Sequence, residues 1–506
     1  MIRVLLLIPA VAAVLSLVVR NALLRRSILV LAALGHTALT IAAWHTEPAP
    51  LLNGWLMLDK PGLLFLTITS VLFLACSFYA FGYLAGEAGQ RKQDFQEGVL
   101  FTNAPGAVFC ACLELFLATM TLVTLSRHLG LLWVAMEATT LASAPLIYFH
   151  RHHRSLEATW KYLLICSVGI ALALLGNFFM AIAAARPGAE STPIVVDILI
   201  KRGQTLNIPW LKAAFLFFLV GYGTKMGLAP LHTWLPDAHS ESPSVISALL
   251  SGALLNCAFL GILRSYQICA AAGQSEFCRD LLVLFGLMSM GWAAVFILGQ
   301  TDYKRMLAYS SVEHVGIMAL GIGVGAGATF GAVLHAVNHS LTKAMLFMAA
   351  GNILAAYKTK TTTEVRGVLG VLPATAVLWI AGFAAITGMP PFGMFVSEFT
   401  LLQAMIGQGK IGIAVAFLAM LALIFIGMSV VFLNMAQGGL DEGRETSSSA
   451  LSSLPKGDER RGPRPESILA IVPPMALGAL TLMLGLYIPP AVKELLHGVA
   501  AAIGGY

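Results

Sequence analysis

Residues 221–230 read GYGTKMGLAP and place Lys225 inside a long apolar stretch, beside residues that interrupt a helix. Glycine interrupts helices because its backbone is conformationally free, and proline because it lacks a backbone donor. Inside a membrane, the backbone groups bared by such a break must be satisfied by protein, water or an ion. The segment therefore predicts a broken transmembrane helix that carries a lysine at mid-membrane.

The remaining sequence indicates that lipid is the solvent of this chain. Of its 506 residues, 58% are hydrophobic and 11% are charged, and a soluble domain cannot cover its surface with so few charges. A membrane-spanning helix needs about 20 apolar residues. Such stretches occur at 2–19, 27–44, 62–84, 106–125, 129–149, 161–185, 209–228, 244–268, 281–299, 305–327, 330–356, 366–388 with a broken extension to 406, 411–435 and 467–490. The sequence predicts an all-α, polytopic membrane protein of about fourteen transmembrane helices, and we interpret its first stretch as a retained helix.

Lysine and arginine predict the orientation of these helices. They are concentrated in the connections after odd-numbered spans, for example at Arg25, Arg151 and Lys358. Cytoplasmic connections carry the excess of positive charge, so both termini are expected on the outside of the membrane. For a bacterial inner membrane this places them in the periplasm. Residues 436–466, rich in serine, glycine and charge, are expected to form a disordered cytoplasmic loop.

Several classes of site are disfavoured by the sequence. The seven cysteines form no Cys-x-x-Cys pair, so neither a zinc site nor an iron–sulfur cluster has its usual ligands. The glycines between Gly321 and Gly331 lie in an apolar helix and indicate close helix packing rather than a nucleotide loop. We therefore expect no cofactor and no metal in this chain, no nucleic-acid partner, and redox chemistry only in a partner.

The first pair of buried charges is Glu137 and Lys225. Ionisable side chains inside a membrane are expensive, and each is a hypothesis about function. Burial favours the neutral amine of a lysine, whereas a nearby carboxylate favours the ammonium form. Glu137 beside Lys225 would therefore act as a switch that holds a proton when the pair is closed and releases it when the pair opens. A static buried ion pair is the structural alternative.

A second group of polar residues lies in the later spans. His314 follows a patch that contains Tyr309, Ser310 and Ser311, and His335, His339 and Lys343 occur at spacings of four. This spacing sets the last three side chains on one helix face over about 12 Å. A His-x-x-x-His pair also suits a metal ion, but no carboxylate lies on the same helix and the next group is cationic. Because histidine titrates near neutral pH, a proton relay fits better.

The last buried ionisable residue along the spans is Glu398. It follows Gly388, Pro390, Pro391 and Gly393, which predict a second broken helix. The two breaks lie five spans apart, in about the seventh and twelfth spans. This periodicity predicts two five-helix repeats, spans 4–8 and 9–13, and an odd number of helices in each makes the repeats inverted. Glu398 would be the proton exit, with a fixed counter-ion to Lys343 as the alternative.

Three segments resemble a known family: residues 225–243 (KMGLAPLHTWLPDAHSESP), 302–311 (DYKRMLAYSS) and 388–392 (GMPPF). They are similar to the antiporter-like subunits of respiratory complex I and its relatives, and the similarity extends over about residues 100–435. Within that family, residues 240–256 resemble the component F proteins of hydrogenase-4 and formate hydrogenlyase-type complexes. The resemblance implies proton pumping coupled to electron transfer in a peripheral arm with iron–sulfur and [NiFe] centres, and further membrane subunits as partners.

The resemblance also assigns roles to individual residues. It implies that Glu137 and Lys225 are the family's ion pair, and that Glu398 is the terminal charged position in the second broken helix. His314, His335, His339 and Lys343 fall on the family's central hydrophilic axis. Where respiratory subunits often carry a lysine in the eighth span, this chain has Asn256. The link from Lys225 to the axis would then depend on water, on Asn256, or on His232 and His239.

The expected organisation follows from these assignments. Residues 1–100 would form three N-terminal helices, residues 101–435 the proton-conducting domain of helices 4–13, and residues 467–506 a C-terminal transmembrane helix after the polar loop. The function expected is that of a proton-translocating, non-catalytic subunit of a membrane oxidoreductase complex. The alternatives are an Mrp-type cation/proton antiporter subunit, a complex I NADH-quinone oxidoreductase subunit and a purely structural membrane scaffold. The midline is mostly lysine and histidine, whereas a sodium site would favour carboxylates and carbonyls.

Overall fold

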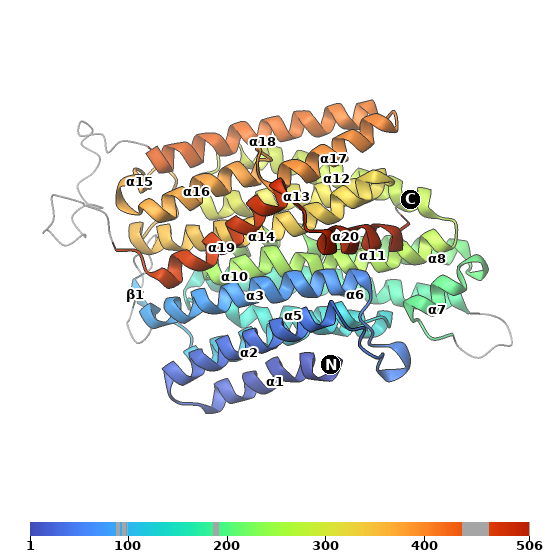
Figure 1. Ribbon diagram of the computed structural model, residues 1–506, viewed down its shortest axis with the longest axis horizontal. Helices are drawn as coiled ribbons and strands as arrows, with labels where there is room; N and C mark the ends of the chain where they lie inside the picture. Colours follow the sequence, from blue (N-terminus) through green and yellow to red (C-terminus); the bar gives the residue numbers. More distant parts are fainter. Residues whose placement is uncertain (88–91, 94–97, 99, 186–191, 438–464, 505–506) are drawn as a thin grey trace, which may run out of the picture.

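The computed structural model describes residues 1–506 except 88–91, 94–97, 99, 186–191, 438–464 and 505–506. The predicted polar loop at 436–466 thus lies largely outside the described residues. Figure 1 shows long helices that run roughly parallel, with both chain termini toward the same end of the bundle. The elements in chain order are α1 (Ile2–Val18), α2 (Ala22–Ala43), η1 (Leu52–Gly54), α3 (Lys60–Glu87), β1 (Lys92–Gln93), β2 (Leu100–Phe101), α4 (Gly106–Leu125), α5 (Leu129–Ile147), α6 (His153–Ala184), α7 (Val196–Lys201), η2 (Gly203–Thr205), α8 (Ile208–Met226), α9 (Trp234–Glu241), α10 (Ser244–Leu249), η3 (Leu250–Leu254), α11 (Leu255–Ala271), α12 (Ser275–Ile297), α13 (Tyr303–Val324), α14 (Gly327–Tyr357), α15 (Val368–Val371), α16 (Pro373–Ile386), α17 (Gly393–Gly407), α18 (Ile411–Gln437), α19 (Ile468–Leu486) and α20 (Pro490–Ala502). The strands β1 and β2 pair antiparallel.

The described helices make fourteen crossings, as the apolar stretches predict. Ten of them are helices, or continuous helical runs, that are long and apolar enough to span a membrane by themselves. The others are the shorter α1, the 31-residue α14, and the two broken helices α8–α9 and α16–α17. The chain is therefore a multi-pass membrane protein.

Burial separates an inner layer of helices from an outer one. The apolar window of the α10–α11 run is 100% buried and that of α13 is 94% buried, whereas the windows of α18 and α19 are 28% buried. Large apolar side chains such as Leu31 and Val168 are exposed on the outer helices, where lipid is expected to cover them. The inner helices, α10–α11 and α13 among them, can therefore carry polar side chains that are shielded from lipid.

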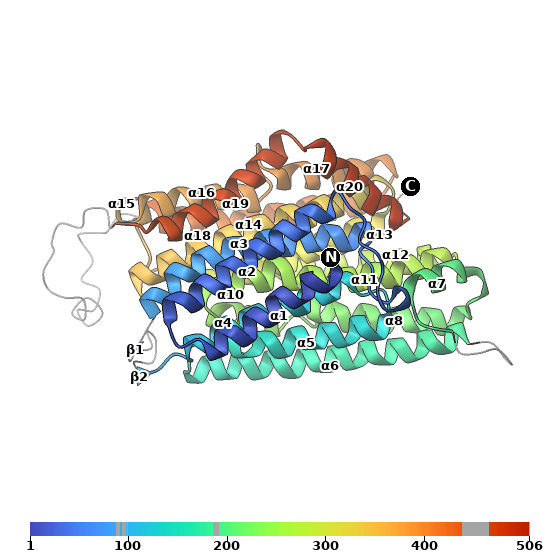
Figure 2. The ribbon, with the colours of Figure 1, turned by 60° about the horizontal axis from the view of Figure 1, so that its bottom comes forward.

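The predicted internal repeat is present. The crossings α4, α5, α6, α8–α9 and α10–α11 form the first five-helix unit, and α12, α13, α14, α16–α17 and α18 form the second. Each unit has its break in the fourth crossing. Because each unit has an odd number of crossings, the second runs through the membrane in the direction opposite to the first. Figure 2 shows α5 and α6 at one side of the bundle and α16 and α17 at the other.

The last crossing differs from the single C-terminal helix predicted for residues 467–506. Helix α19 ends at Leu486 and α20 begins at Pro490, so this crossing is also broken. Figure 1 shows α20 continuing from α19 toward the C-terminus. A β-carbon on Gly485 would overlap Pro391 in the break between α16 and α17. The two breaks thus pack directly against each other, an arrangement that only glycine at position 485 permits.

Candidate functional site

Side chains form hydrogen bonds with the free backbone groups at the first break, which follows α8. Helix α8 ends at Gly227, whose φ of +87° lies in the left-handed region that glycine tolerates best. The indole Nε1 of Trp234 donates to the backbone carbonyl of Thr224 over 2.8 Å. The backbone N–H of Ala229 donates to Ser289 Oγ over 2.9 Å. These bonds stabilise an interruption of the helix inside the membrane, just after Lys225.

Lys225 is fully buried and reaches Glu137 only through a hydroxyl. Its Nζ donates to Thr140 Oγ1 over 2.5 Å and to the Tyr162 hydroxyl over 2.8 Å. Thr140 Oγ1 lies 3.4 Å from Glu137 Oε2, and Ser167 donates to Glu137 Oε1 over 2.8 Å. Glu137 itself is partly exposed, which corrects the expectation that it is buried. The predicted pair is therefore an indirect one, bridged by a threonine that the sequence did not single out.

Asn256 connects the first repeat to the second. It follows the π-helical turn Leu250–Leu254, a local widening of the helix of a kind that often marks functional sites. Its Nδ2 donates to the Gly252 carbonyl over 2.8 Å and to Ser340 Oγ over 2.6 Å. Ser340 adjoins His339 on α14. Asn256 thus joins α11 to α14 through a serine, while its predicted link to Lys225 stays a prediction.

The spacing of four on α14 sets three side chains on one face, and that face lies against α13. His335 Nε2 lies 3.0 Å from His314 Nδ1, within hydrogen-bond distance. The rings of His339 and His314 have centroids 5.3 Å apart, and Lys343 Nζ donates to Ser310 Oγ. All three α14 residues are fully buried. Two helices therefore enclose a stripe of imidazole, hydroxyl and ammonium groups.

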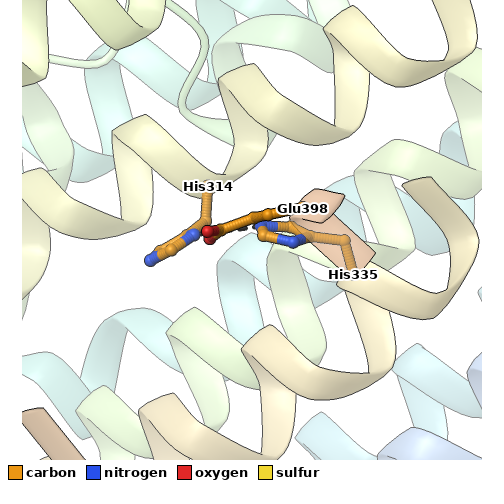
Figure 3. A group of neighbouring side chains, drawn as sticks. All are labelled: His314, His335 and Glu398. Atoms are coloured by element: carbon orange, nitrogen blue, oxygen red, sulfur yellow. Dashed lines mark hydrogen bonds between the residues drawn. The ribbon is translucent and has the colours of Figure 1, made fainter. Parts of the chain in front are cut away.

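Glu398 joins this stripe from a third helix. Figure 3 shows its carboxylate beside the rings of His314 and His335. One ligand-type atom from each of the three lies within 4.8 Å of the others, which places a carboxylate beside the histidines although α14 carries none. His335 Nδ1 also lies 3.0 Å from Ser397 Oγ. The imidazoles already bond to each other and to a hydroxyl, so the arrangement suits proton transfer. Because the three residues could also bind a metal ion, the prediction that this chain holds no metal requires a measurement.

The two remaining histidines have different surroundings. His239 stacks on Phe347 with centroids 5.0 Å apart, and neither of its ring nitrogens has a hydrogen-bond partner within the described chain. It also interacts electrostatically with Lys343. His232 instead lies against Trp292 and Tyr309. The structure therefore places His239 near the central stripe, whereas His232 lies among aromatic rings of α12 and α13.

Two buried carboxyls, Glu114 on α4 and Glu313 on α13, were not identified from the sequence. Glu313 is 2% exposed, and its Oε2 has no hydrogen-bond partner among the residues that the structure covers. This atom lies 4.0 Å from His314 Nε2, and the carboxyl interacts electrostatically with Glu398 and Lys343. A signal was present, because Glu313 stands in an apolar helix directly before His314.

A cluster of ion pairs that was not identified from the sequence joins the helices at the end opposite the basic connections. Arg127 pairs with Asp59 at 2.6 Å and also with Asp197. Arg264, fully buried, contacts Asp59 and the carbonyl of Ser126. Burial acts against the charge of Arg127, but the two carboxylates outweigh it and hold its pKa above the ordinary value. These residues join α3, α5, α7 and α11, and we interpret them as structural.

A cavity opens at the end of the bundle that carries the basic connections. It has a volume of about 130 Å³ and lies where α3, α6, α9, α13 and α14 approach each other. Ser240, Ser242 and Lys304 line it, and the Nζ of Lys304 donates to the carbonyl of Ser242 over 2.6 Å. Ser240 directly follows His239. The cavity lining therefore lies one residue from a histidine close to the central stripe.

Comparison with known proteins relates this arrangement to a family. Residues 126–424 match the family model described as NADH:quinone oxidoreductase/Mrp antiporter, TM. A hydrogenase-4 component F homolog of Methylacidiphilum infernorum is 34% identical over 86% of this chain and 88% of its own length. NADH-quinone oxidoreductase subunit N of Desulforudis audaxviator is 29% identical over 82% of this chain and 78% of its own.

The fold is shared with a solved membrane complex. A chain of the archaeal membrane-bound sulfane sulfur reductase superposes with a TM-score of 0.84 at 20% identity, covering 99% of this chain and 97% of that one. The family match includes both breaks, Lys225 and Glu398. The chain therefore belongs to the NADH:quinone oxidoreductase/Mrp antiporter family of membrane proteins.

Proposed function

We propose that this chain is a proton-translocating membrane subunit of a redox-driven complex of the hydrogenase-4, formate hydrogenlyase or complex I kind. The observation that supports this best is the row of buried polar groups between the two broken helices. It runs through Lys225, Asn256, His339, His335 and Glu398. Ionisable groups are expensive inside a membrane, and a row of them marks an ion pathway rather than a packing need.

The breaks give this row its two ends. Lys225 directly precedes the break after α8, and Glu398 lies against Gly388 in the break after α16. Broken helices are tolerated at membrane depth where they line a water-filled path. We place proton uptake at the cavity beside Lys304 and proton release at Glu398. Residues 101–435 form the conducting part in this proposal, and residues 1–100 and 467–506 flank it.

The electron chemistry is assigned to partners. Relatives named as hydrogenase-4 components and as a subunit of NADH-quinone oxidoreductase support an assembly with further membrane subunits. We place iron–sulfur and [NiFe] centres in a peripheral arm of that assembly. We place the complex in a bacterial inner membrane with the basic connections, which include Arg151 and Lys358, in the cytoplasm and both termini in the periplasm.

The test is proton transfer by the complete assembly. The complex is purified through a tag on this chain, its subunits are identified by mass spectrometry, and it is reconstituted in liposomes. Electron transfer is started with reduced methyl viologen, and the lumen pH is followed with a trapped dye. We expect acidification that an uncoupler abolishes and that Lys225→Ala removes, while the assembly still forms. Electron transfer without any acidification in the unaltered complex would exclude the proposal.

The Mrp-type alternative is separated by the same vesicles. An antiporter moves protons when a sodium gradient is imposed, without electron transfer. Because lysine and histidine predominate between Lys225 and Glu398, we expect no sodium-dependent signal. A proton flux that requires a sodium gradient and is lost in Lys225→Ala would favour the antiporter instead.

A further inference from the structure

In each repeat a lysine donates to a hydroxyl that lies three residues from a carboxyl residue on the same helix. On α5, Thr140 is three residues from Glu137 and accepts a hydrogen bond from the Nζ of Lys225. On α13, Ser310 is three residues from Glu313 and accepts a hydrogen bond from the Nζ of Lys343. Residues three apart on a helix are neighbours on its surface. The second crossing of each repeat therefore holds a carboxyl and a hydroxyl near a lysine, and in the first repeat the hydroxyl also bonds the carboxylate.

The lysine of the second repeat comes from a different helix. Lys225 comes from the broken crossing of its repeat, whereas Lys343 comes from the unbroken α14. Lys343 also donates to the Leu307 carbonyl over 2.7 Å, on the same helix that carries Glu313. Lys343 is thus anchored to α13 one helical turn from Glu313, and a fixed counter-ion role of Glu398 toward Lys343 remains the alternative to be tested.

Glu313 also faces the group that leads to the exit. Its Oε2 and the Nε2 of His314 are both buried, both lack a hydrogen-bond partner among the described residues, and lie 4.0 Å apart. A side-chain shift of about 1 Å would bring them to the usual hydrogen-bond distance. A buried polar atom without a partner costs free energy, so two such atoms facing each other indicate a contact made during function.

We propose that Glu313 is a further proton carrier, which takes a proton from Lys343 and passes it through His314 to Glu398. In the first step the ammonium of Lys343 becomes an amine and the Glu313 carboxylate becomes a carboxylic acid. In the second, that acid returns to carboxylate and His314 becomes an imidazolium. In the third, the imidazolium gives its proton to the Glu398 carboxylate. The inference rests on the proposed function and adds to it the step between the central stripe and the exit.

The experiment compares Glu313→Gln with a matched control in the vesicle assay. The matched control is Glu114→Gln, because Glu114 is also fully buried, on α4, and both its oxygens lack partners within the described residues. We expect Glu313→Gln to lower the number of protons moved per electron at least about tenfold, because a relay group contributes on that scale or more. Glu114→Gln should leave the ratio unchanged. Electron transfer should persist in both assemblies.

The outcomes separate this inference from the proposed function. If Lys225→Ala stops proton transfer and Glu313→Gln does not, Glu313 is no carrier and the proposed function stands. If neither substitution affects proton transfer, the result contradicts the proposed function and not only the inference about Glu313. Should Glu313→Gln prevent assembly, Glu313→Asp decides: a carrier with a shorter side chain transfers protons more slowly and with an altered pH profile. Proton transfer at the unaltered rate by an assembled Glu313→Asp complex would overturn the inference.

Discussion

Lys225 donates a hydrogen bond to Thr140 over 2.5 Å, and the Thr140 hydroxyl stands between this lysine and the carboxylate of Glu137. The charge of the carboxylate therefore reaches the lysine through a group that can rotate. A rotating hydroxyl can accept from the ammonium and donate to the carboxylate at the same time. When it rotates, the hydroxyl can also break its hydrogen bonds to the ammonium and to the carboxylate, and this rotation would open the switch.

The first prediction concerns this hydroxyl. Thr140→Val keeps the side-chain shape but removes the bridge, so proton transfer should fall about tenfold, and Thr140→Ser should retain most of it. Thr139→Val is the matched control, because the hydroxyl of Thr139 bonds only to the Met136 carbonyl among the described residues. Proton flux in vesicles gives the measurement. Equal activity of Thr140→Val and Thr140→Ser would show that the hydroxyl has no part in the switch.

The second prediction concerns the charge of Lys225. Lys225→Arg should assemble but transfer protons at least about tenfold more slowly, because arginine hardly deprotonates and cannot take part in a release step. Glu137→Gln should also depress proton transfer, since the lysine loses the carboxylate that favours its charged form. Lys161→Arg is a control at an exposed lysine. Full coupling in Lys225→Arg would mean that this residue serves as a fixed charge.

The third prediction compares His335 with His339. His335 bonds to His314 and Ser397, so His335→Leu should both slow proton transfer and lower the melting temperature of the complex. His339 has no hydrogen-bond partner among the residues described, so His339→Leu should slow transfer with little loss of stability. His339→Gln should be milder because an amide still bonds water. Equal proton transfer by His339→Leu and His339→Gln would argue against a hydrated stripe.

The fourth prediction concerns the exit. Glu398→Gln removes both the charge and proton exchange, and it should abolish most proton transfer with assembly intact. Glu398→Asp keeps a titrating group with a shorter reach, so part of the transfer should remain. Proton flux and thermal stability are measured together on both variants. Unreduced flux in Glu398→Gln with a lowered melting temperature would make Glu398 a structural partner and place the exit elsewhere.

The fifth prediction tests the metal alternative. His314, His335 and Glu398 are residue types that zinc also binds. Because the two imidazoles bond to each other, we expect elemental analysis of the purified complex to find no zinc or nickel that depends on this chain. Comparison with the His335→Leu complex corrects for metal held by other subunits. One equivalent of zinc or nickel that disappears in His335→Leu would establish a metal site on the central stripe.

The sequence predicted the membrane crossings and the two central breaks well. Crossing number depends on the length of apolar stretches, and a break such as that at Gly227 depends on local backbone chemistry, so both can be read from neighbouring residues. The stripe of His335, His339 and Lys343 was also predictable, because one helix fixes its spacing. The break at residues 487–489 was missed although Pro489 and Pro490 mark it.

The contacts between helices were decided by the tertiary structure alone. Nothing in the local sequence shows that Thr140 stands between Glu137 and Lys225, or that Glu398 reaches the two histidines. Such contacts depend on the rotation and height of each helix relative to its neighbours, which packing against several helices sets at once. The sequence by itself thus determined which charges enter the membrane and on which helix each one lies. The packing of the helices decided which of these charges meet, and proton transfer depends on those meetings.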